Sequence, residues 1–218
     1  MTAQVALPDD DFAVVDVEAT RRRLTARQAE VVANLVRAGE EETEEVGYAG
    51  VTVRGVARRA GVAPATAYTY FSSKDHLLAE VLWRRMEALP PVDEDPTVPM
   101  AERVERTVRD MIPFADGSPA LVDACTVALI SPSPDVAHLR DRIGALTQRR
   151  LTAAIGPGID PRVVRVLEAS YSGALLTAGT GHRSFLDIPA FVADAAGMLV
   201  AGAGAAATPA TVRKGARR

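Results

Sequence analysis

The sequence predicts an all-α protein with about nine helices. Apolar residues recur at intervals of three and four in most segments, which is the spacing that places them on one face of a helix. Aromatic residues make up only 5% of the chain, and the 16 Gly and 14 Pro residues lie mainly between the periodic segments. These observations favour helices separated by sharp breaks, with three helices in a small N-terminal domain and the others in a larger C-terminal domain.

The composition is that of an ordinary globular protein. Of the 218 residues, 48% are hydrophobic and 24% are charged, so neither a disordered chain nor a membrane protein is indicated. The single cysteine, Cys125, forms no intrachain disulfide and fits a reducing compartment. The N-terminus lacks the positive charge and apolar run of a signal peptide, and the most apolar stretch contains Asp194. We therefore expect a cytoplasmic protein.

Residues 1–23 predict a flexible arm, since they lack periodicity and include Pro8 and three successive aspartates. Three arginines at 21–23 either begin a solvated helix or lie on nucleic-acid phosphates. A first helix is expected next, with Thr25 as its N-cap, and it ends near Gly39 or continues through Glu45. We interpret the acidic run at 40–45 as a solvated face, and residues 47–50 as the break after it.

Two short helices joined by a tight turn are expected after this break. Thr52 is placed to cap the first, Gly61 suits the turn because glycine adopts left-handed conformations, and Pro64 suits the first turn of the second helix. The spacing directs one set of apolar residues inward: Val56, Ala57, Ala60, Val62, Ala67 and Phe71. The remaining positions of the second helix face outward: Ala65, Thr66, Tyr68, Thr69 and Tyr70.

This outward face has the chemistry of a DNA-reading surface. Small residues let a helix enter the major groove, and Thr and Tyr hydroxyls reach phosphates or base edges. Although the net charge is −3, residues 51–86 carry six basic side chains against two acidic ones, so a local basic face remains. Ser73 is expected to cap a longer helix over residues 74–89, where Lys74 is either a phosphate contact or a solvated lysine. The prolines at 90–99 end this helix.

Residues 51–81, VTVRGVARRAGVAPATAYTYFSSKDHLLAEV, resemble the helix-turn-helix of TetR-type transcriptional regulators, and the resemblance covers residues 24–89. It is closest to a branch that controls lipid or steroid catabolism. The resemblance implies a homodimeric, ligand-responsive repressor of a palindromic operator. It implies DNA contacts at Thr52, Arg54, Ala65, Thr66, Tyr68, Thr69, Tyr70 and Lys74. Residues 40–45 lengthen the first helix beyond the usual pattern, which puts the placement of the arm in doubt.

Five further helices are expected over residues 100–112, 119–130, 136–155, 162–178 and 188–203. The last two are rich in small residues, and the resemblance implies that they form a four-helix bundle with a second copy. In the alternative interpretation, part of the surface formed by these small residues packs within one subunit. The expected apolar contacts of the dimer are Leu175, Leu176, Phe191, Met198 and Leu199.

An effector cavity is expected among the middle helices, with few charges on its wall and therefore a hydrophobic ligand. Each candidate is also a candidate core residue: Met86, Val104, Val108, Met111, Phe114, Leu121, Cys125, Leu129, Ile143, Leu146, Leu167 and Tyr171. The expected division is thus an arm at 1–23, a DNA-binding domain at 24–73, an effector and dimerisation domain at 74–205, and a disordered basic tail at 206–218.

No catalytic, metal or cofactor site is indicated by the sequence. His76, His138 and His182 lie on different segments without partners at metal-ligand spacing. No phosphate-binding loop, dinucleotide fingerprint or nucleophile elbow is present. A helical enzyme and a protein-binding adaptor with a helix-turn-helix remain the alternatives. Clustered catalytic groups would favour the former, and a lack of salt-dependent DNA affinity would favour the latter.

Overall fold

The computed structural model describes residues 26–112 and 117–206. The expected arm, including the arginines at 21–23, the basic tail from 207 onward and the cavity candidate Phe114 therefore lie outside the described residues. Within the described ranges the regular structure is entirely helical, as predicted. The helices are α1 (Ala26–Gly50), α2 (Val53–Arg59), α3 (Pro64–Tyr70), α4 (Lys74–Glu87), α5 (Met100–Asp110), α6 (Pro119–Leu129), α7 (Pro134–Ile155), α8 (Pro161–Gly179) and α9 (Ile188–Ala206), with a short 3₁₀ turn, η2 (Phe185–Asp187), before α9.

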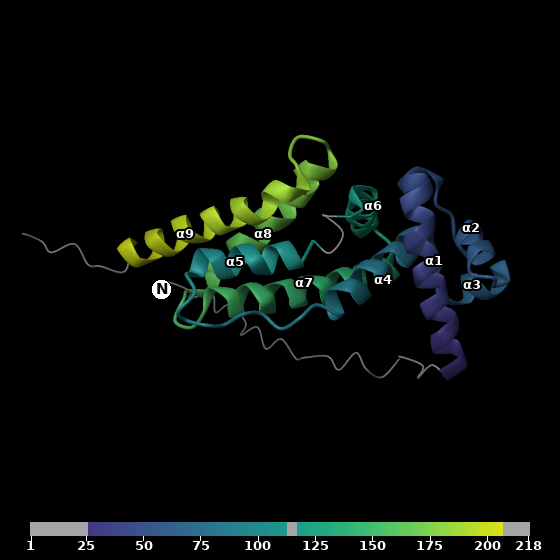
Figure 1. Cartoon of the computed structure of the whole chain (residues 1–218), viewed down its shortest axis with the longest axis horizontal. Coiled ribbons are helices and arrows are strands. Elements are labelled where there is room, and N and C mark those ends of the chain that lie inside the picture. Colours follow the sequence, from purple (N-terminus) through teal and green to yellow (C-terminus); the bar gives the residue numbers. More distant parts are fainter. Residues whose placement is uncertain (1–25, 113–116, 207–218) are drawn as a thin grey trace, which may run out of the picture.

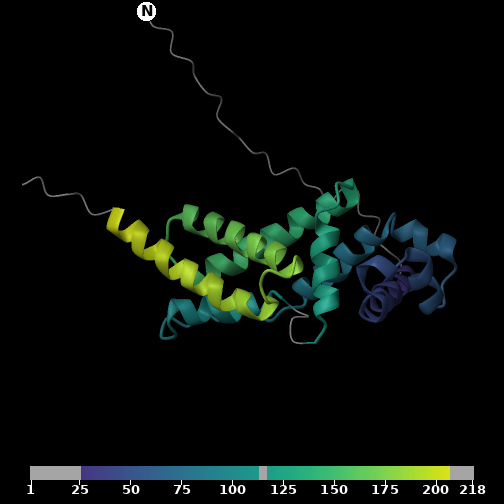
Figure 2. The ribbon, with the colours of Figure 1, turned by 90° about the horizontal axis from the view of Figure 1, so that it is seen from above.

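Helices α1, α2 and α3 form a small head at one end of an elongated molecule (Figures 1 and 2). The local signals act as expected. The Thr52 side chain accepts a hydrogen bond from the Gly55 amide, Pro64 opens α3, and Gly61 takes a positive φ of 67° in the turn between them. The first helix continues through the acidic run and kinks at Gly47, where φ is 65° and ψ is 178°.

Helix α4 leads from the head into the body of the molecule (Figure 1). Ser73 caps it by accepting a hydrogen bond from the His76 amide. One side of α4 is fully buried, and it packs against α1, α6 and α7. This helix begins directly after the head and contacts the body, so it connects the two parts of the molecule.

The body consists of α5 to α9. Helices α5, α7, α8 and α9 run lengthwise, whereas α6 lies across them next to α1 and α4 (Figure 1). Two buried arginines, Arg103 and Arg150, connect segments of the body that are distant in the sequence. Arg103 donates to the carbonyl oxygens of Val98, Ala154 and Ile155, and Arg150 donates to that of Pro90. The proline-rich connection after α4 is therefore anchored to α7.

Helix α9 is apolar along most of its length. By length and composition alone, the stretch over residues 185–203 could cross a membrane. In the fold it packs lengthwise on α5 and α8, with Ile188, Val192 and Ala196 fully buried. Only a third of the apolar stretch is covered, so a large part of this helix remains available for contact with another molecule.

Candidate functional site

The exposed face of α3 is the first part of the candidate site. Ala65, Thr66, Tyr68 and Thr69 are exposed, and the Tyr68 side chain keeps about half of its surface accessible, at 51%. Ala67 is fully buried and fixes the opposite face of the helix against the core. The structure thus presents small residues and hydroxyls outward, which is the surface required to enter a major groove.

Two residues of this face differ from the simplest expectation. Tyr70 is half-buried and packs against the core, so its ring supports α3 instead of standing free. The Thr69 hydroxyl donates to the Ala65 carbonyl oxygen at 3.0 Å. It retains lone pairs that can accept a hydrogen bond, and its methyl group remains on the exposed surface. The helical spacing alone did not predict that the ring of Tyr70 packs against the core.

Lys74 occupies the first turn of α4 and is not a freely solvated lysine. Its Nζ donates to the Tyr48 carbonyl oxygen at 2.7 Å and lies 3.9 Å from the centre of the Tyr48 ring. The Tyr48 hydroxyl donates to Asp75 Oδ1 at 2.8 Å, and burial together with this carboxylate raises the pKa of Tyr48. Tyr48 therefore positions the ammonium group at the helix N-terminus, where backbone amides also favour an anion.

The acidic run at 40–45 is solvated only in part, because Glu41, Glu44 and Glu45 are exposed whereas Glu42 is buried. Glu42 is only 8% exposed, and its Oε2 accepts from Arg59 Nε at 2.7 Å. Glu45 also accepts a hydrogen bond from Arg59, and Glu40 accepts from Arg85 at 2.6 Å. These glutamates neutralise two arginines that the sequence counted toward the basic patch. Because Arg59 is seventeen positions beyond Glu42, no local pattern reveals the pairing.

Arg54 and Arg58 provide the basic charge that remains on α2. Both are exposed, and no ion pair involves either of them within residues 26–112 and 117–206. The basic surface that residues 51–86 provide is therefore narrower than the sequence count suggests, and its main contributors are these two arginines beside α3 and Lys74 at the start of α4. Thr52 caps α2 as expected, with its side-chain oxygen accepting from the Gly55 amide at 3.0 Å, and the residue remains exposed.

We expect Glu42→Ala to lower the free energy of unfolding by about 1–2 kcal/mol, since a nearly buried charge-assisted hydrogen bond between α1 and α2 is lost. Urea unfolding followed by circular dichroism measures the change. Glu41→Ala is the matched control, because this carboxylate is exposed and lies 4.0 Å from Arg59. Equal stability of the two variants would show that the Arg59 pairing contributes nothing to the fold.

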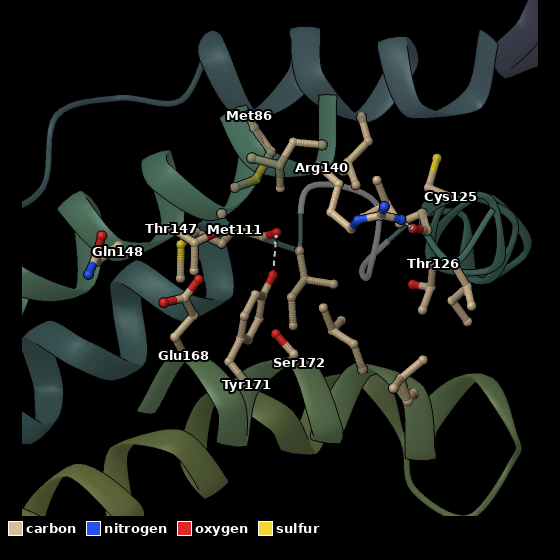
Figure 3. Close-up of a pocket in the computed structure, with 18 of the residues that line it drawn as sticks. Met86, Met111, Cys125, Thr126, Arg140, Thr147, Gln148, Glu168, Tyr171 and Ser172 are labelled. Carbon is tan, nitrogen blue, oxygen red and sulfur yellow. Dashed lines mark hydrogen bonds between the residues drawn. The ribbon is translucent and has the colours of Figure 1, made fainter. Parts of the chain in front are cut away.

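A cavity of about 740 Å³ forms the second part of the candidate site. It lies between α4, the end of α5, α6, α7 and α8, and Figure 3 shows side chains from these helices converging on it. This volume is within the range of about 300–1,000 Å³ typical of small-molecule pockets. Six of the expected residues line its wall: Met86, Met111, Cys125, Leu129, Ile143 and Tyr171.

The other cavity candidates are placed elsewhere. Four are buried in the core away from the wall, namely Val104, Val108, Leu121 and Leu167. Leu146 is half-buried and packs on the core, whereas Leu175 and Leu176, expected at a dimer contact, line the cavity. Apolar periodicity identifies the inward face of each helix but not which inward residues border an unfilled space.

The cavity wall is more polar than expected. It includes the charged residues Arg140, Asp141 and Glu168, together with Gln148 and the hydroxyls of Thr126, Thr147 and Ser172. This corrects the expectation of few charges. Asp141, Gly144, Ala145 and Gln148 recur at helical spacing along α7, a pattern that sequence analysis alone reads as a solvated face.

The two titratable groups deepest in the cavity wall are inert. Burial raises the pKa of the Cys125 thiol, whose Sγ lies 3.5 Å from the Leu78 carbonyl oxygen. Burial also raises the pKa of Tyr171, whose hydroxyl donates to the Met111 carbonyl oxygen at 3.0 Å. Both groups are therefore neutral near pH 7, and neither is an activated nucleophile.

The outer surface of α8 and α9 forms the third part of the candidate site. Leu176, Phe191 and Met198 are exposed by 45%, 36% and 71%, and the half-buried Leu175 and Leu199 lie near them along the two helices. Val166 and Leu186 extend this apolar surface, which the sequence did not predict for them. Some of the small residues, Ala174, Ala178 and Ala196, pack within the subunit.

A polar contact joins the head to α7. The Ser72 hydroxyl donates to Asp135 Oδ2 at 2.6 Å, and His76 Nδ1 lies 3.8 Å from the same carboxylate oxygen. Burial lowers the pKa of His76, which keeps the ring neutral near pH 7. Asp135 is in the first turn of α7, the helix that provides Arg140 and Asp141 to the cavity wall. His76 has a structural role here, and no group of metal ligands occurs within the described residues.

Comparison with known proteins gives a consistent result. The family model for bacterial regulatory proteins of the tetR family matches residues 35–81. An uncharacterized HTH-type transcriptional regulator of Mycobacterium tuberculosis is 44% identical over 179 residues, which are 81% of this chain and 84% of the relative. The HTH-type transcriptional repressor KstR of Rhodococcus jostii is 33% identical over 111 residues, covering 50% of this chain and 52% of that protein.

A solved structure agrees with these relatives. The crystal structure of a TetR transcriptional regulator from Rhodococcus sp. RHA1 superposes with a TM-score of 0.62 at 26% identity, covering 81% of this chain and 98% of that one. The similarity therefore extends over both the head and the body, beyond the helices that the family model matches.

Proposed function

The chain belongs to the TetR family of bacterial regulatory proteins, and we propose that it is a homodimeric repressor that binds a palindromic operator and releases it when a small molecule fills the cavity. As a member of this family it is a helix-turn-helix transcriptional regulator and not an enzyme. Repression is favoured by the similarity to KstR, which is named as a repressor. Its place of action is the cytoplasm, on chromosomal DNA.

The exposed face of α3 is the observation that carries this proposal. A seven-residue helix that buries Ala67 and exposes Tyr68 and Thr69 is suited to enter the major groove of DNA as far as the base edges. We assign base contacts to Arg54, Ala65, Thr66 and Thr69, and phosphate contacts to Thr52, Tyr68 and Lys74. Tyr70 acts mainly by supporting α3.

Dimerisation through α8 and α9 follows from the exposed apolar surface on these helices. Met198 and Phe191 of α9 are exposed by 71% and 36%, and a second copy covers such an apolar surface by twofold symmetry. A dimer places two heads on one DNA molecule. We retain the division into a DNA-binding domain at 24–73 and an effector and dimerisation domain from residue 74, with α4 as the connection.

Effector response requires a ligand that prefers one arrangement of the heads over another. Leu82 and Met86 of α4 line the cavity, and the N-terminus of α4 carries Lys74 beside the head. Ser72 and Asp135 give a second connection, between the head and α7. A ligand that moves α4 or α7 therefore changes the separation of the two heads and lowers operator affinity.

We expect Thr69→Ala to change base preference at one position of each half-site, since each well-formed base contact contributes about 1–3 kcal/mol of discrimination. Selection of binding sites from random DNA measures the preference of both proteins. A palindromic consensus for the wild-type protein supports a dimer that binds two half-sites. Identical consensus sequences for both proteins would contradict the proposed base contact of Thr69. A protein-binding adaptor would give no enriched sequence and no salt-dependent DNA affinity.

A further inference from the structure

The charges on the cavity wall define the class of ligand more closely than its apolar lining does. Three charged side chains border the space: Arg140 and Asp141 of α7, and Glu168 of α8. The floor is apolar and consists mainly of Leu82, Met86, Met111 and Ile112. A hydrocarbon body fits this floor, so the question is which polar group the remaining wall accepts.

Arg140 is already engaged by the protein. Its Nη1 donates to the Leu129 carbonyl oxygen at 2.5 Å and to the Ser131 carbonyl oxygen at 3.2 Å. These oxygens belong to the C-terminal end of α6, which carries the negative end of the helix dipole. Arg140 therefore acts as a cap for α6, and its Nη1 is already bonded to backbone oxygens before a ligand arrives.

Glu168 and Asp141 are in the opposite situation. Neither carboxylate has an ion pair or a side-chain hydrogen bond within the parts of the chain that the structure describes. Glu168 is half-buried, and its Oε1 comes within 3.5 Å of the position that a Cβ on Gly144 would occupy. A side chain at 144 would meet this carboxylate only at ordinary van der Waals distance, so Glu168 lies directly beside α7 at the seam of α7 and α8. Asp141 lies one helical turn from Gly144 on the same side of α7.

Figure 3 shows that Arg140 and Glu168 lie apart from one another in the cavity wall. Glu168 lies with Thr147 and Gln148 near Tyr171, whereas Arg140 lies toward Cys125 and Thr126. A carboxylate partly removed from water gains most from a cation or a strong donor close to it. An anionic ligand would instead meet two carboxylates that have no ion-pair partner among the described residues, and a guanidinium whose Nη1 is already bonded.

We propose that the cavity binds a lipophilic amine, a hydrocarbon body that carries a protonated nitrogen held by Glu168 and Asp141. The apolar floor takes the hydrocarbon, and the ammonium group donates to the carboxylate of Glu168 at the seam between α7 and α8. This inference rests on the proposed function for its biological meaning, because it names the class of effector for the same cavity. The binding itself does not depend on the DNA-binding role.

The test uses the full chain without DNA and three ligands that share one hydrocarbon, namely decylamine, decanol and decanoate, below their micelle concentrations. Titration calorimetry measures each affinity, and the fluorescence of Trp83, the only tryptophan of the chain, gives a second readout because Leu82 beside it lines the cavity. We expect decylamine to bind about tenfold more tightly than decanol, because one charge-assisted hydrogen bond supplies about that gain in affinity. Decanoate is expected to bind most weakly of the three.

Glu168→Gln keeps the size of the side chain and removes its charge. We expect it to lower the affinity for decylamine about tenfold and to leave that for decanol nearly unchanged, and Asp141→Asn to act in the same direction more weakly. Glu30→Gln on the exposed surface of α1 is the matched control and should alter neither. Thermal unfolding of each variant shows whether the fold is retained.

Several results would overturn the proposal. Decanoate binding as tightly as decylamine would do so, and loss of that binding in Arg140→Gln would assign charge recognition to Arg140. An amine preference unchanged in Glu168→Gln would also contradict it, as would the absence of binding by all three ligands. Operator release is measured separately. If decylamine binds as expected but operator affinity stays the same, the ligand class stands and the effector role in the proposed function fails.

Discussion

Replacing Met198 by Asp is expected to convert the protein from a dimer to a monomer and to abolish specific operator binding. Met198 is the most exposed large apolar side chain of α9, at 71%. A carboxylate at the centre of an apolar contact, present once from each subunit, loses its hydration without gaining a partner and costs about 3 kcal/mol or more. Light scattering coupled to size exclusion measures the oligomeric state, and a mobility-shift assay measures operator affinity.

Ala101→Asp provides the control for this substitution. Ala101 is also exposed and helical, but it lies at the start of α5, where a carboxylate is favourable to the helix dipole. This variant should remain dimeric with unchanged operator affinity. If Met198→Asp stays dimeric as well, the subunits associate through another surface, and the apolar residues of α8 and α9 require a different explanation.

The helix boundaries were predictable because the signals that set them are local. Thr52 and Ser73 each cap a helix by accepting a hydrogen bond from an amide three residues further on. Pro64 opens α3 because its own backbone geometry suits the first turn of a helix, independently of distant contacts. The breaks at Gly47 and Gly61 follow from the same kind of information, since both residues adopt a positive φ. The order and bounds of the nine described helices therefore follow closely from the sequence.

The site was only partly predictable because its features depend on contacts between distant segments. Glu42 and Arg59 pair across the α1–α2 contact, so a run that looks like a solvated acidic face becomes part of the fold. The ring of Tyr70 turns toward the core although its spacing suggests exposure. Ion pairing and ring orientation of this kind are set by tertiary packing, and the polar and apolar pattern of a single helix is a weak guide to that packing.

The cavity shows the same limit more sharply. An inward-facing residue borders a cavity only if the helix opposite stands away from it, and the spacing within one helix does not contain that information. Leu167 is completely buried in the core, whereas Tyr171, one turn later on the same helix, lines the cavity. Arg140, Asp141 and Glu168 were missed because charged residues on amphipathic helices normally face water.

Lys74→Ala is expected to weaken binding to every DNA sequence by about 1–3 kcal/mol, because it removes the ammonium group at the N-terminus of α4 that we propose as a contact to the DNA backbone. Tyr48 fixes this group through its carbonyl oxygen and its ring. Tyr68→Phe removes only a neutral hydroxyl and is expected to cause a loss in the same range. The two variants are thus expected to have similar affinities, but only Lys74→Ala changes the charge of the protein. This difference in charge allows the two kinds of DNA contact to be distinguished.

The salt dependence of binding separates the two roles. Each lysine that neutralises a phosphate contributes about 0.9 to the slope of log K against log salt concentration, so Lys74→Ala should flatten the slope whereas Tyr68→Phe should leave it unchanged. Shift assays over a series of salt concentrations, with the wild-type operator and an unrelated duplex, give both quantities. Arg109→Ala, on the exposed surface of α5, controls for the loss of a positive charge far from the head. A Lys74→Ala protein with wild-type affinity and slope would show that the Tyr48 contact serves the fold alone, and that α4 does not dock on the DNA backbone.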